Sequence, residues 1–375
     1  MRRIRKYIYD RPDWPKFHWN QTALAQQIVA VSHQQGRLIG HMEALGFPLQ
    51  QEAVLKSLTN EVVKSSEIEG EHLDPDEVRS SIARRLGMDI GGLKPVDRHV
   101  EGIVEMMLDA TRQYDKPVTR ERLFSWHASL FPTGRSAMRR IRVGFWRDDR
   151  TGPMQVVSGS MGHERVHYEA PSAKRVAHEM QAFLAWVNSG KHDRAGDAVL
   201  KAGLAHLWFV TIHPFEDGNG RIARAIADLA LARSERTPQR FYSMSAQIQQ
   251  ERAAYYDALE RTQKGTLDVT LWVEWFLECL SRAIDGAQTA LGAVLSKARF
   301  WQIFGDMAFN ERQRLVLNRL LDGFEGKLTT AKWAKLAQCS QDTALRDILH
   351  LVERGVLVRN PEGGRSTSYA LAPVR

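Results

Sequence analysis

The sequence predicts a mainly helical protein with a β-hairpin beside its central helices and a small winged helix-turn-helix at its C-terminal end. Apolar residues recur at spacings near 3.6 over most of the chain, for example across 21–45. Two short runs at 154–158 and 165–168 flank a glycine-rich turn, which predicts the hairpin. Helix caps and turn residues between 311 and 371 lead into two short extended runs, which predicts the winged unit.

Composition indicates an ordinary globular chain of two or three domains. Of its 375 residues 43% are hydrophobic, enough for buried cores, and the net charge of +8 permits a nucleic acid or an acidic protein as partner. Cys279 and Cys339 lie far apart and lack metal-type spacing, so we expect neither a disulfide framework nor a zinc site, and we expect a cytoplasmic location. No apolar run follows the basic N-terminus, as a signal peptide would require, and none in the chain is long enough to span a bilayer, so we expect no membrane contact.

Breaks in the helical pattern divide the chain into four parts. We expect an N-terminal region at 1–95, a core at 96–285, a linker helix at 286–309 and a C-terminal domain at 310–375. Within the first two parts, the pattern predicts helices at 21–45, about 50–70, 80–87, 96–114, 119–130, 172–189, 197–212, 222–233 and 272–284.

The densest group of functional residue types occupies 213–224, with the sequence HPFEDGNGRIAR. It lies between two predicted helices, and Gly218–Gly220, with Asn219 at its centre, allows a tight turn. The amides of that turn would converge beside the N-terminus of the second helix, which is an arrangement that binds anions. Arg221 and Arg224 lie three residues apart on one helix face, and guanidinium groups suit phosphate oxygens.

Two further residues of this segment suit phosphate chemistry. Asp217 is a hard oxygen ligand of the kind that Mg²⁺ takes together with phosphate oxygens. His213, at the end of the first helix, can accept a proton near neutral pH. A helical hairpin with a polar turn is the alternative, but it explains neither the His-Pro-Phe before the turn nor the paired arginines after it.

The whole segment resembles the Fic signature, H-P-F-x-[DE]-G-N-G-R-x-x-R, with every fixed position present. Fic proteins mostly transfer the AMP of ATP to a hydroxyl side chain of a target protein. The resemblance implies that His213 deprotonates the attacking hydroxyl and that Asp217 holds Mg²⁺ on the α- and β-phosphates. It also implies that the Gly218–Gly220 amides cradle the phosphates, while Arg221 and Arg224 offset the charge of the leaving pyrophosphate.

The helix expected to end near residue 70 has an acidic terminus, Ser65-Ser66-Glu67-Ile68-Glu69-Gly70, which a solvated helix end also explains. Through Ser65, Glu69 and Gly70 it resembles the inhibitory motif [ST]-x-x-x-E-[GN] of Fic proteins. The resemblance implies that Glu69 pairs with Arg224 and so withholds that arginine from the γ-phosphate of ATP. It further implies the subclass whose inhibitory helix precedes the core in the same chain.

The predicted hairpin resembles the flap that lies over the Fic site and pairs with an extended, hydroxyl-bearing segment of the target. Val166, His167 and Tyr168 occupy its descending arm, beside the implied nucleotide site. A surface hairpin without such a role is the alternative interpretation.

After the signature, Tyr255 and Tyr256 stand at the distance where a Fic core has a tyrosine pair against the adenosine. Gln263 takes the place of an asparagine that touches the nucleotide in relatives, and it keeps the amide. Two core tyrosines with no ligand are the alternative.

The last part of the chain resembles a winged helix-turn-helix only generically. The pattern predicts a helix at 311–321, a second helix capped by Thr329 or Thr330, and a third capped by Ser340. A two-stranded wing would follow, and the third helix and the wing would expose Gln341, Thr343, Arg346, Asp347, His350 and Arg365. These residue types read DNA, but such domains also bind proteins or dimerise, so DNA, a protein partner and a homodimer stay open.

These observations predict a protein adenylyltransferase that uses ATP and Mg²⁺, is restrained by Glu69 and modifies itself as well as target proteins. Two alternatives stay open, a nucleotide-sensing DNA-binding regulator and a hydrolase that removes AMP from proteins. His213 favours an enzyme, because a sensor has no need of a base. The target and the signal that releases Glu69 are not encoded in any recognisable motif.

Overall fold

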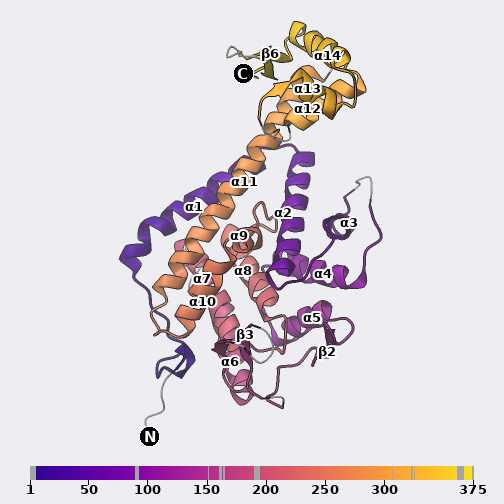
Figure 1. Ribbon diagram of the computed structural model, residues 1–375. Coiled ribbons are helices and arrows are strands. Elements are labelled where there is room, and N and C mark those ends of the chain that lie inside the picture. Colours follow the sequence, from indigo (N-terminus) through magenta and orange to yellow (C-terminus); the bar gives the residue numbers. More distant parts are fainter. Residues whose placement is uncertain are drawn as a thin grey trace. The chain divides into compact units, whose positions relative to one another are not determined.

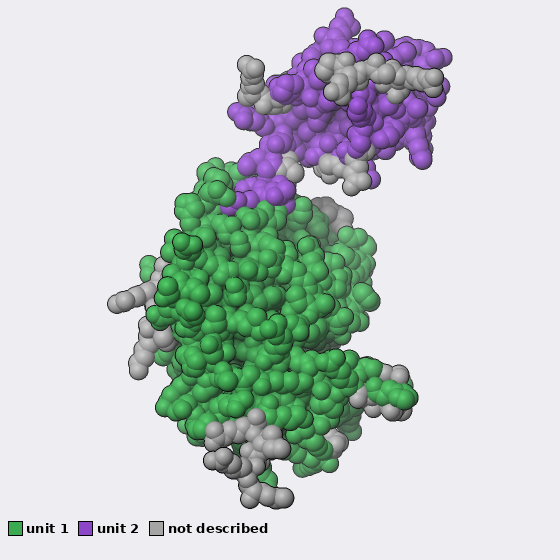
Figure 2. Space-filling model, turned by 60° about the vertical axis from the view of Figure 1, so that its left-hand side comes forward, with its two compact units in different colours: residues 1–287 green, residues 288–375 purple. Residues whose placement is uncertain are grey.

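The computed structural model is mainly helical, as predicted, with small β-hairpins (Figure 1). It forms two compact units, Met1–Ala287 and Gln288–Arg375, which are coloured separately in Figure 2. The predicted division between 1–95 and 96–285 falls inside the first unit and stays a prediction. The residues that the structure describes are 6–88, 93–150, 152–159, 163, 165–189, 195–305, 307–321, 324, 326–360 and 367–373.

Two antiparallel neighbours in sequence, α7 (Ala195–Ile212) and α8 (Asn219–Glu235), form the centre of the first unit (Figure 1). Their described side chains are buried along almost their full length. α7 is apolar nearly all round, whereas α8 also buries Arg221, Arg224 and Asp228, each in an ion pair. The helices that pack on this pair are α1 (Gln21–Glu43), α2 (Phe47–Ile68), α4 (Arg98–Arg112), α5 (Arg120–Leu130) and α6 (Ala173–Val187). The loop between α7 and α8 is therefore held by a rigid scaffold.

The remaining elements of the first unit are a 3₁₀ turn at Ile8–Asp10, α3 (Pro75–Arg85), α9 (Met244–Gln250) and α10 (Arg252–Gln263). α11 (Thr270–Phe304) begins in the first unit, and its residues from Gln288 onward belong to the second. Several predicted boundaries were wrong. α3 begins at Pro75 and not at 80, because the Asp74 side chain caps it. α2 begins at Phe47, before the expected start near 50, because the proline in its first turn fits a first helical turn. The predicted helix at 272–284 and the linker helix form the single 35-residue helix α11. None of the described helices has the length and apolar character needed to cross a membrane.

The predicted flap is the antiparallel pair β3 (Gln155–Ser158) and β4 (Arg165–Glu169). Val156 pairs with Tyr168 and Val157 with Val166, so a β-bulge leaves His167 between the two pairs. The turn expected at 159–162 lies largely outside the described residues.

A second hairpin precedes the flap, although the sequence predicted a single one before the C-terminal unit. It pairs β1 (Arg135–Ser136) with β2 (Arg139–Arg140). Each strand has two residues and neither alternates apolar with polar side chains, so no periodic pattern marks them. The side chain of Ser172, the N-cap residue of α6, makes no capping hydrogen bond; instead the Asp149 carboxylate accepts a hydrogen bond from the Ala173 amide at 2.7 Å.

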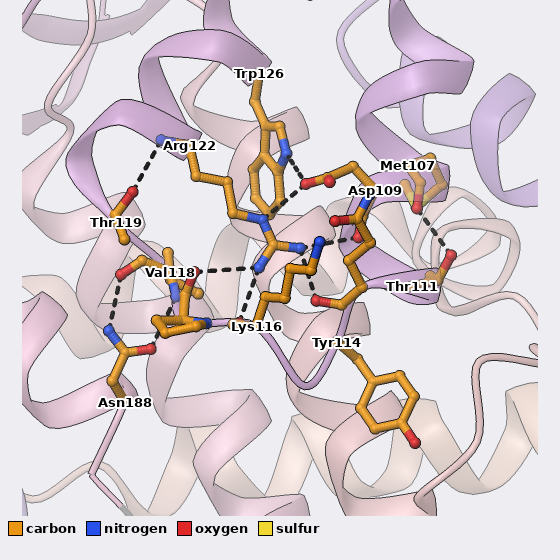
Figure 3. A network of polar contacts seen from close by, with 12 residues as sticks. Met107, Asp109, Thr111, Tyr114, Lys116, Val118, Thr119, Arg122, Trp126 and Asn188 are labelled. Carbon is orange, nitrogen blue, oxygen red and sulfur yellow. Dashed lines mark hydrogen bonds and ion pairs between the residues drawn. The ribbon is translucent and has the colours of Figure 1, made fainter.

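A partly buried polar network joins α5 to α4 (Figure 3). Arg122 on α5 donates to the Asp109 carboxylate at 2.7 Å and to the Asp109 carbonyl at 2.9 Å, and the Trp126 indole donates to the same carboxylate at 2.6 Å (Figure 3). Trp126 is a core residue. The network matters for the site because Phe131, at the end of α5, lies against Gly218 in the loop between α7 and α8.

The second unit contains α12 (Glu311–Leu321), α13 (Thr330–Leu336), α14 (Gln341–Glu353) and a sheet with the strand order β5 (Leu328–Thr329), β7 (Ser368–Leu371), β6 (Leu357–Arg359). The predicted caps are confirmed, because Thr329 and Ser340 accept hydrogen bonds from the third amide of α13 and α14, respectively. The predicted two-stranded wing is a three-stranded sheet. Asp347, expected on the surface, is buried and accepts a hydrogen bond from Arg312 at 3.0 Å, while Arg365 lies outside the described residues.

Candidate active site

His213 directly follows α7 and has a left-handed backbone, with φ 52°. Its ring Nδ1 lies 3.3 Å from the Val210 carbonyl, which can only accept, so Nδ1 carries the proton and Nε2 is left as an acceptor. Burial lowers the pKa of His213 to about 4, so the ring is neutral at physiological pH. Two residues further on, Phe215 is fully buried and stacks on His127, which fixes the loop to α5.

Arg147 holds the His213 backbone in place, and the sequence did not indicate this contact. Its guanidinium is buried and donates to the His213 carbonyl at 2.7 Å and to the carbonyl of Pro171, just after the flap. Its backbone amide donates to the Pro214 carbonyl at 2.9 Å. The charge is balanced by Asp149, whose carboxylate lies 3.0 Å away. Arg147 therefore joins the histidine loop to the end of the flap.

The turn after the loop is built around a glycine and an asparagine. Gly218 has φ 78°, and a Cβ there would lie 2.9 Å from the ring of Phe131, so only glycine fits without displacement. Asn219 is buried, and its side chain accepts from the Phe215 amide and donates to the Phe215 carbonyl, both at 2.9 Å. Asn219 thus clamps the turn with its side chain and can offer a ligand only its backbone amide.

Asp217 is half-buried at the entrance of the turn. One carboxylate oxygen accepts from the Gly218 amide at 2.6 Å, and the other accepts from the Ser136 hydroxyl of the short first hairpin. In the described part of the chain, no three His, Cys, Asp or Glu side chains gather into a group that could hold a metal ion. A lone carboxylate fits Mg²⁺ only when phosphate and water supply the remaining oxygens.

Glu69 directly follows α2, and the structure places it against Arg224 on α8. The buried guanidinium donates to the Glu69 carboxylate at 2.8 Å, to the Ser65 hydroxyl at 2.9 Å and to the Ser65 carbonyl at 2.8 Å. The carboxylate also touches the first turn of α8, because a Cβ on Gly220 would lie 2.0 Å from it. Gly70, with φ 84°, lets the chain turn away directly after Glu69.

A second carboxylate occupies the other signature arginine, and sequence reasoning missed it. Arg221 donates to Glu71 at 2.7 Å, and the other oxygen of Glu71 contacts the ring of His99 on α4. Burial alone would raise the pKa of Glu71, but the His99 hydrogen bond and the charge of Arg221 outweigh it and lower the pKa. The sequence did contain one signal for Glu71: it stands two residues after Glu69, and the glycine between them allows the chain to turn.

A cavity of about 740 Å³ lies beside His213, a size typical of small-molecule sites. Of the residues predicted for the site, it is lined by Glu69, His167, Tyr168, His213, Gly220, Tyr255, Tyr256 and Gln263. The other predicted residues, all within the described ranges, do not line it: Ser65, Gly70, Val166, Asp217, Gly218, Asn219, Arg221 and Arg224. Lining residues that sequence reasoning missed include Ser158, Val210, Arg252, Leu259 and Glu260.

The predicted adenosine contacts differ in how accessible they are. Tyr255 is buried, and its hydroxyl lies 2.9 Å from Nε2 of His206, so it belongs mostly to the core. Tyr256 is 37% exposed, and its hydroxyl donates to the Ile68 carbonyl at 3.4 Å. Gln263 is buried and donates to the Thr211 hydroxyl at 3.3 Å. Of the two tyrosines, Tyr256 therefore has the more accessible ring.

The flap contacts α10 through its bulged histidine. Nδ1 of His167 lies 2.6 Å from the Glu260 carboxylate, and Nε2 lies 2.6 Å from the Ser158 hydroxyl. Hydrogen bonds, the strongest from Lys264 and another from His167, lower the pKa of Glu260 to about 2. Val166, in contrast, is exposed and stays outside the cavity lining.

Two family models match this chain, a domain of unknown function (DUF4172) at residues 7–88 and the Fic/DOC family at residues 117–231. Curated proteins named protein adenylyltransferase Fic, from Drosophila ananassae and Drosophila melanogaster, are 34% identical to it over 106 residues, which are 28% of this chain. The chain spans 20% of the length of these relatives. A crystal structure of a Fic family protein from Desulfovibrio desulfuricans shares the fold, with a TM-score of 0.51, 21% identity, and coverage of 92% of this chain and 95% of that one.

Proposed function

Because residues 117–231 match the Fic/DOC family model, we propose that this chain is a protein adenylyltransferase. It transfers AMP from ATP to a hydroxyl side chain of Tyr, Thr or Ser in a target protein and releases pyrophosphate. One observation carries the proposal: His213 lines the cavity as a neutral imidazole whose Nε2 is free to accept a proton. Gly220, at the start of α8, lines the same cavity, so a base and an anion-binding helix terminus meet there.

The reaction needs a proton acceptor and groups that offset phosphate charge. The target hydroxyl loses its proton to Nε2 of His213 as its oxygen bonds to the α-phosphorus, and the bond to the pyrophosphate oxygen breaks. The amides of Gly218–Gly220 and the guanidinium groups of Arg221 and Arg224 face the negative charge of the phosphates. Asp217 would hold Mg²⁺, which supplies further charge neutralisation when it is bound with the nucleotide.

The N-terminal region restrains this reaction. Glu69 takes the Arg224 guanidinium that a γ-phosphate would use and sits against Gly220, where phosphate oxygens would approach the helix. ATP then binds in a non-productive pose until Glu69 withdraws. Glu71 occupies Arg221 in the same way, which supports a restraint acting on both arginines.

The flap binds the target segment, and α10 binds the adenosine of ATP. An extended target segment adds to the exposed edge of the flap, where Val157 is 49% exposed, by backbone pairing. The Tyr256 ring packs on the adenine base. The Arg252 guanidinium lies over the same ring, 5.4 Å from its centre. We also place the protein in the cytoplasm, since Cys279 and Cys339 are both free thiols.

A nucleotide-sensing regulator that binds DNA is the second candidate, and the exposed Gln341 and Arg346 of α14 favour it. Leu345 and Leu349 on the same helix are 39% and 52% exposed, and apolar side chains suit a protein partner or a second copy better than a phosphate backbone. Removal of AMP from proteins is a third reaction open to the same site.

The decisive experiment compares wild type, Glu69→Gly and Glu69→Gly/His213→Ala, each incubated with α-labelled ATP, Mg²⁺ and a cell extract. We expect Glu69→Gly to label extract proteins and the double variant to lose that label by roughly 10²–10⁴-fold, the usual contribution of a general base. Absence of label in every sample, together with tight ATP binding and a DNA mobility shift, would favour the regulator. Loss of label from previously labelled proteins would favour the hydrolase.

A further inference from the structure

Hydroxyl groups of the chain itself line the proposed nucleotide cavity. Among the described lining residues, four carry a hydroxyl: Ser158, Tyr168, Tyr255 and Tyr256. Burial raises the pKa of all three phenols, and each hydroxyl already has an internal partner. Tyr168 and Tyr255 are, in addition, almost fully buried. Ser158 differs from them because it is exposed and bonds to the side chain of an accessible base.

Ser158, His167 and Glu260 form a linear chain of hydrogen bonds. The Ser158 hydroxyl lies 2.6 Å from Nε2 of His167, and Nδ1 of His167 lies 2.6 Å from the Glu260 carboxylate. An ionised carboxylate can only accept, so Nδ1 carries the proton and Nε2 accepts from Ser158. A hydroxyl, a base and a group that orients the base in this order are the parts of an activated nucleophile.

Two features of the flap and α10 keep this chain of contacts in place. The β-bulge leaves His167 outside the regular strand pairs, and bulges commonly redirect a side chain toward a site. Glu260 also contacts Lys264 at 2.6 Å and Arg165 at 3.2 Å, and its pKa of about 2 keeps it ionised. The orienting carboxylate is therefore charged at any pH at which the protein works.

We propose that Ser158 is an AMP acceptor within the chain itself, with His167 as its general base and Glu260 as the residue that positions His167. The proposal rests on the proposed function, because the donor is the ATP of the same cavity. The Ser158 oxygen bonds to the α-phosphorus, the bond from that phosphorus to the pyrophosphate oxygen breaks, and pyrophosphate leaves. The Ser158 proton moves to Nε2 of His167, so no further reactant is needed.

This assignment has a kinetic consequence. Since the acceptor lines the cavity of its own chain, modification is intramolecular, and its rate constant does not depend on protein concentration. Each chain also accepts a single AMP at this position. Both properties distinguish Ser158 from a residue that happens to be modified by another copy.

The test uses the full chain with Glu69→Gly, α-labelled ATP and Mg²⁺, at several protein dilutions. Tandem mass spectrometry of the peptide spanning 151–165 assigns the AMP group to Ser158 or to another hydroxyl. We expect Ser158→Ala to remove this label and Ser158→Thr to keep it. His167→Gln keeps a hydrogen bond but cannot take the proton, so it should lower the initial labelling rate about 10²-fold. Ser172→Ala, at an exposed serine outside the cavity, is the matched control and should leave labelling unchanged.

The outcomes separate this inference from the proposed function. Label at a different residue, label that survives Ser158→Ala, or a rate that grows with protein concentration would overturn the inference and uphold the transferase. Labelled extract proteins with an unlabelled enzyme would do the same. No label on any protein would overturn both. Thermal unfolding of each variant shows whether a lost label reflects a lost fold, and Ser158→Thr gives the answer if Ser158→Ala is unstable.

Discussion

Replacing Glu69 with alanine should destabilise the nucleotide-free protein and tighten its binding of ATP. The carboxylate is the anionic partner of Arg224, whose side chain is 2% exposed. Removing one member of a buried ion pair costs about 3–5 kcal/mol in the free energy of unfolding. Glu69 itself is 33% exposed, so water would reach part of the guanidinium, and we expect about 1–3 kcal/mol. At about 2–4 °C per kcal/mol, Tm should fall by roughly 2–12 °C.

ATP should reverse this loss, because its phosphate replaces the missing carboxylate. A charge-assisted hydrogen bond is worth about 1.5–3 kcal/mol, which corresponds to about 10- to 100-fold tighter binding. Thermal unfolding with and without a non-hydrolysable ATP analogue measures the first effect, and titration calorimetry measures the second.

Glu67→Ala is the matched control for this experiment. Glu67 lies two residues earlier on α2 and pairs with Lys64 at 2.8 Å within the same helix, a contact worth only about 0.2–0.5 kcal/mol. If Glu67→Ala and Glu69→Ala had the same Tm and the same nucleotide affinity, Glu69 would not be competing with phosphate, and the restraint argued here would be refuted.

The other contacts of the site give four further predictions. The value of kcat/KM should hold down to about pH 4, the pKa to which burial lowers His213, since the base works only when deprotonated; a fall centred near pH 6.5 would contradict this. Arg147→Gln removes the hydrogen bond to the His213 carbonyl and a nearby positive charge, so kcat should fall by roughly 10²-fold and the acid limb of the pH profile should move upward. Glu71→Gln frees Arg221, so calorimetry should show about 2- to 10-fold tighter nucleotide binding. Tyr168→Phe loses the 2.6 Å hydrogen bond to the Thr211 carbonyl, and denaturant unfolding should show a loss of about 1 kcal/mol.

Local periodicity predicted the long elements well because their buried apolar residues recur along one helix face. The apolar run before His213 became α7, the helix predicted at 119–130 is α5, and the serine that caps α14 lies where the sequence placed it. The hairpin β1–β2 escaped prediction because two-residue strands have no periodicity to detect. The continuity of α11 escaped it because Gly286, at the start of the supposed linker, is typical of a helix stop, whereas it lies inside the helix.

The signature residues and Glu69 could be predicted because each belongs to a contiguous motif, whereas other partners in the site could not. Glu71, Arg147 and Glu260 come from three separate segments, and only the tertiary fold brings them to Arg221, His213 and His167. The clamp formed by the Asn219 side chain was hidden for a different reason. A Gly-Asn-Gly turn suggests backbone freedom. Nothing in the sequence shows that the side chain of its asparagine forms hydrogen bonds with the backbone four residues earlier.

The fit of Glu69 against Gly220 limits how this protein can be engineered. The carboxylate and, in the proposed active state, the phosphates compete for the same space above one α-carbon, where even a methyl group would collide with the carboxylate. A side chain at position 220 would act as a wedge that evicts the restraint and the substrate alike. Mutational screens for a permanently active form should therefore find no activating substitution at Gly220. They should find activating substitutions at Glu69 instead.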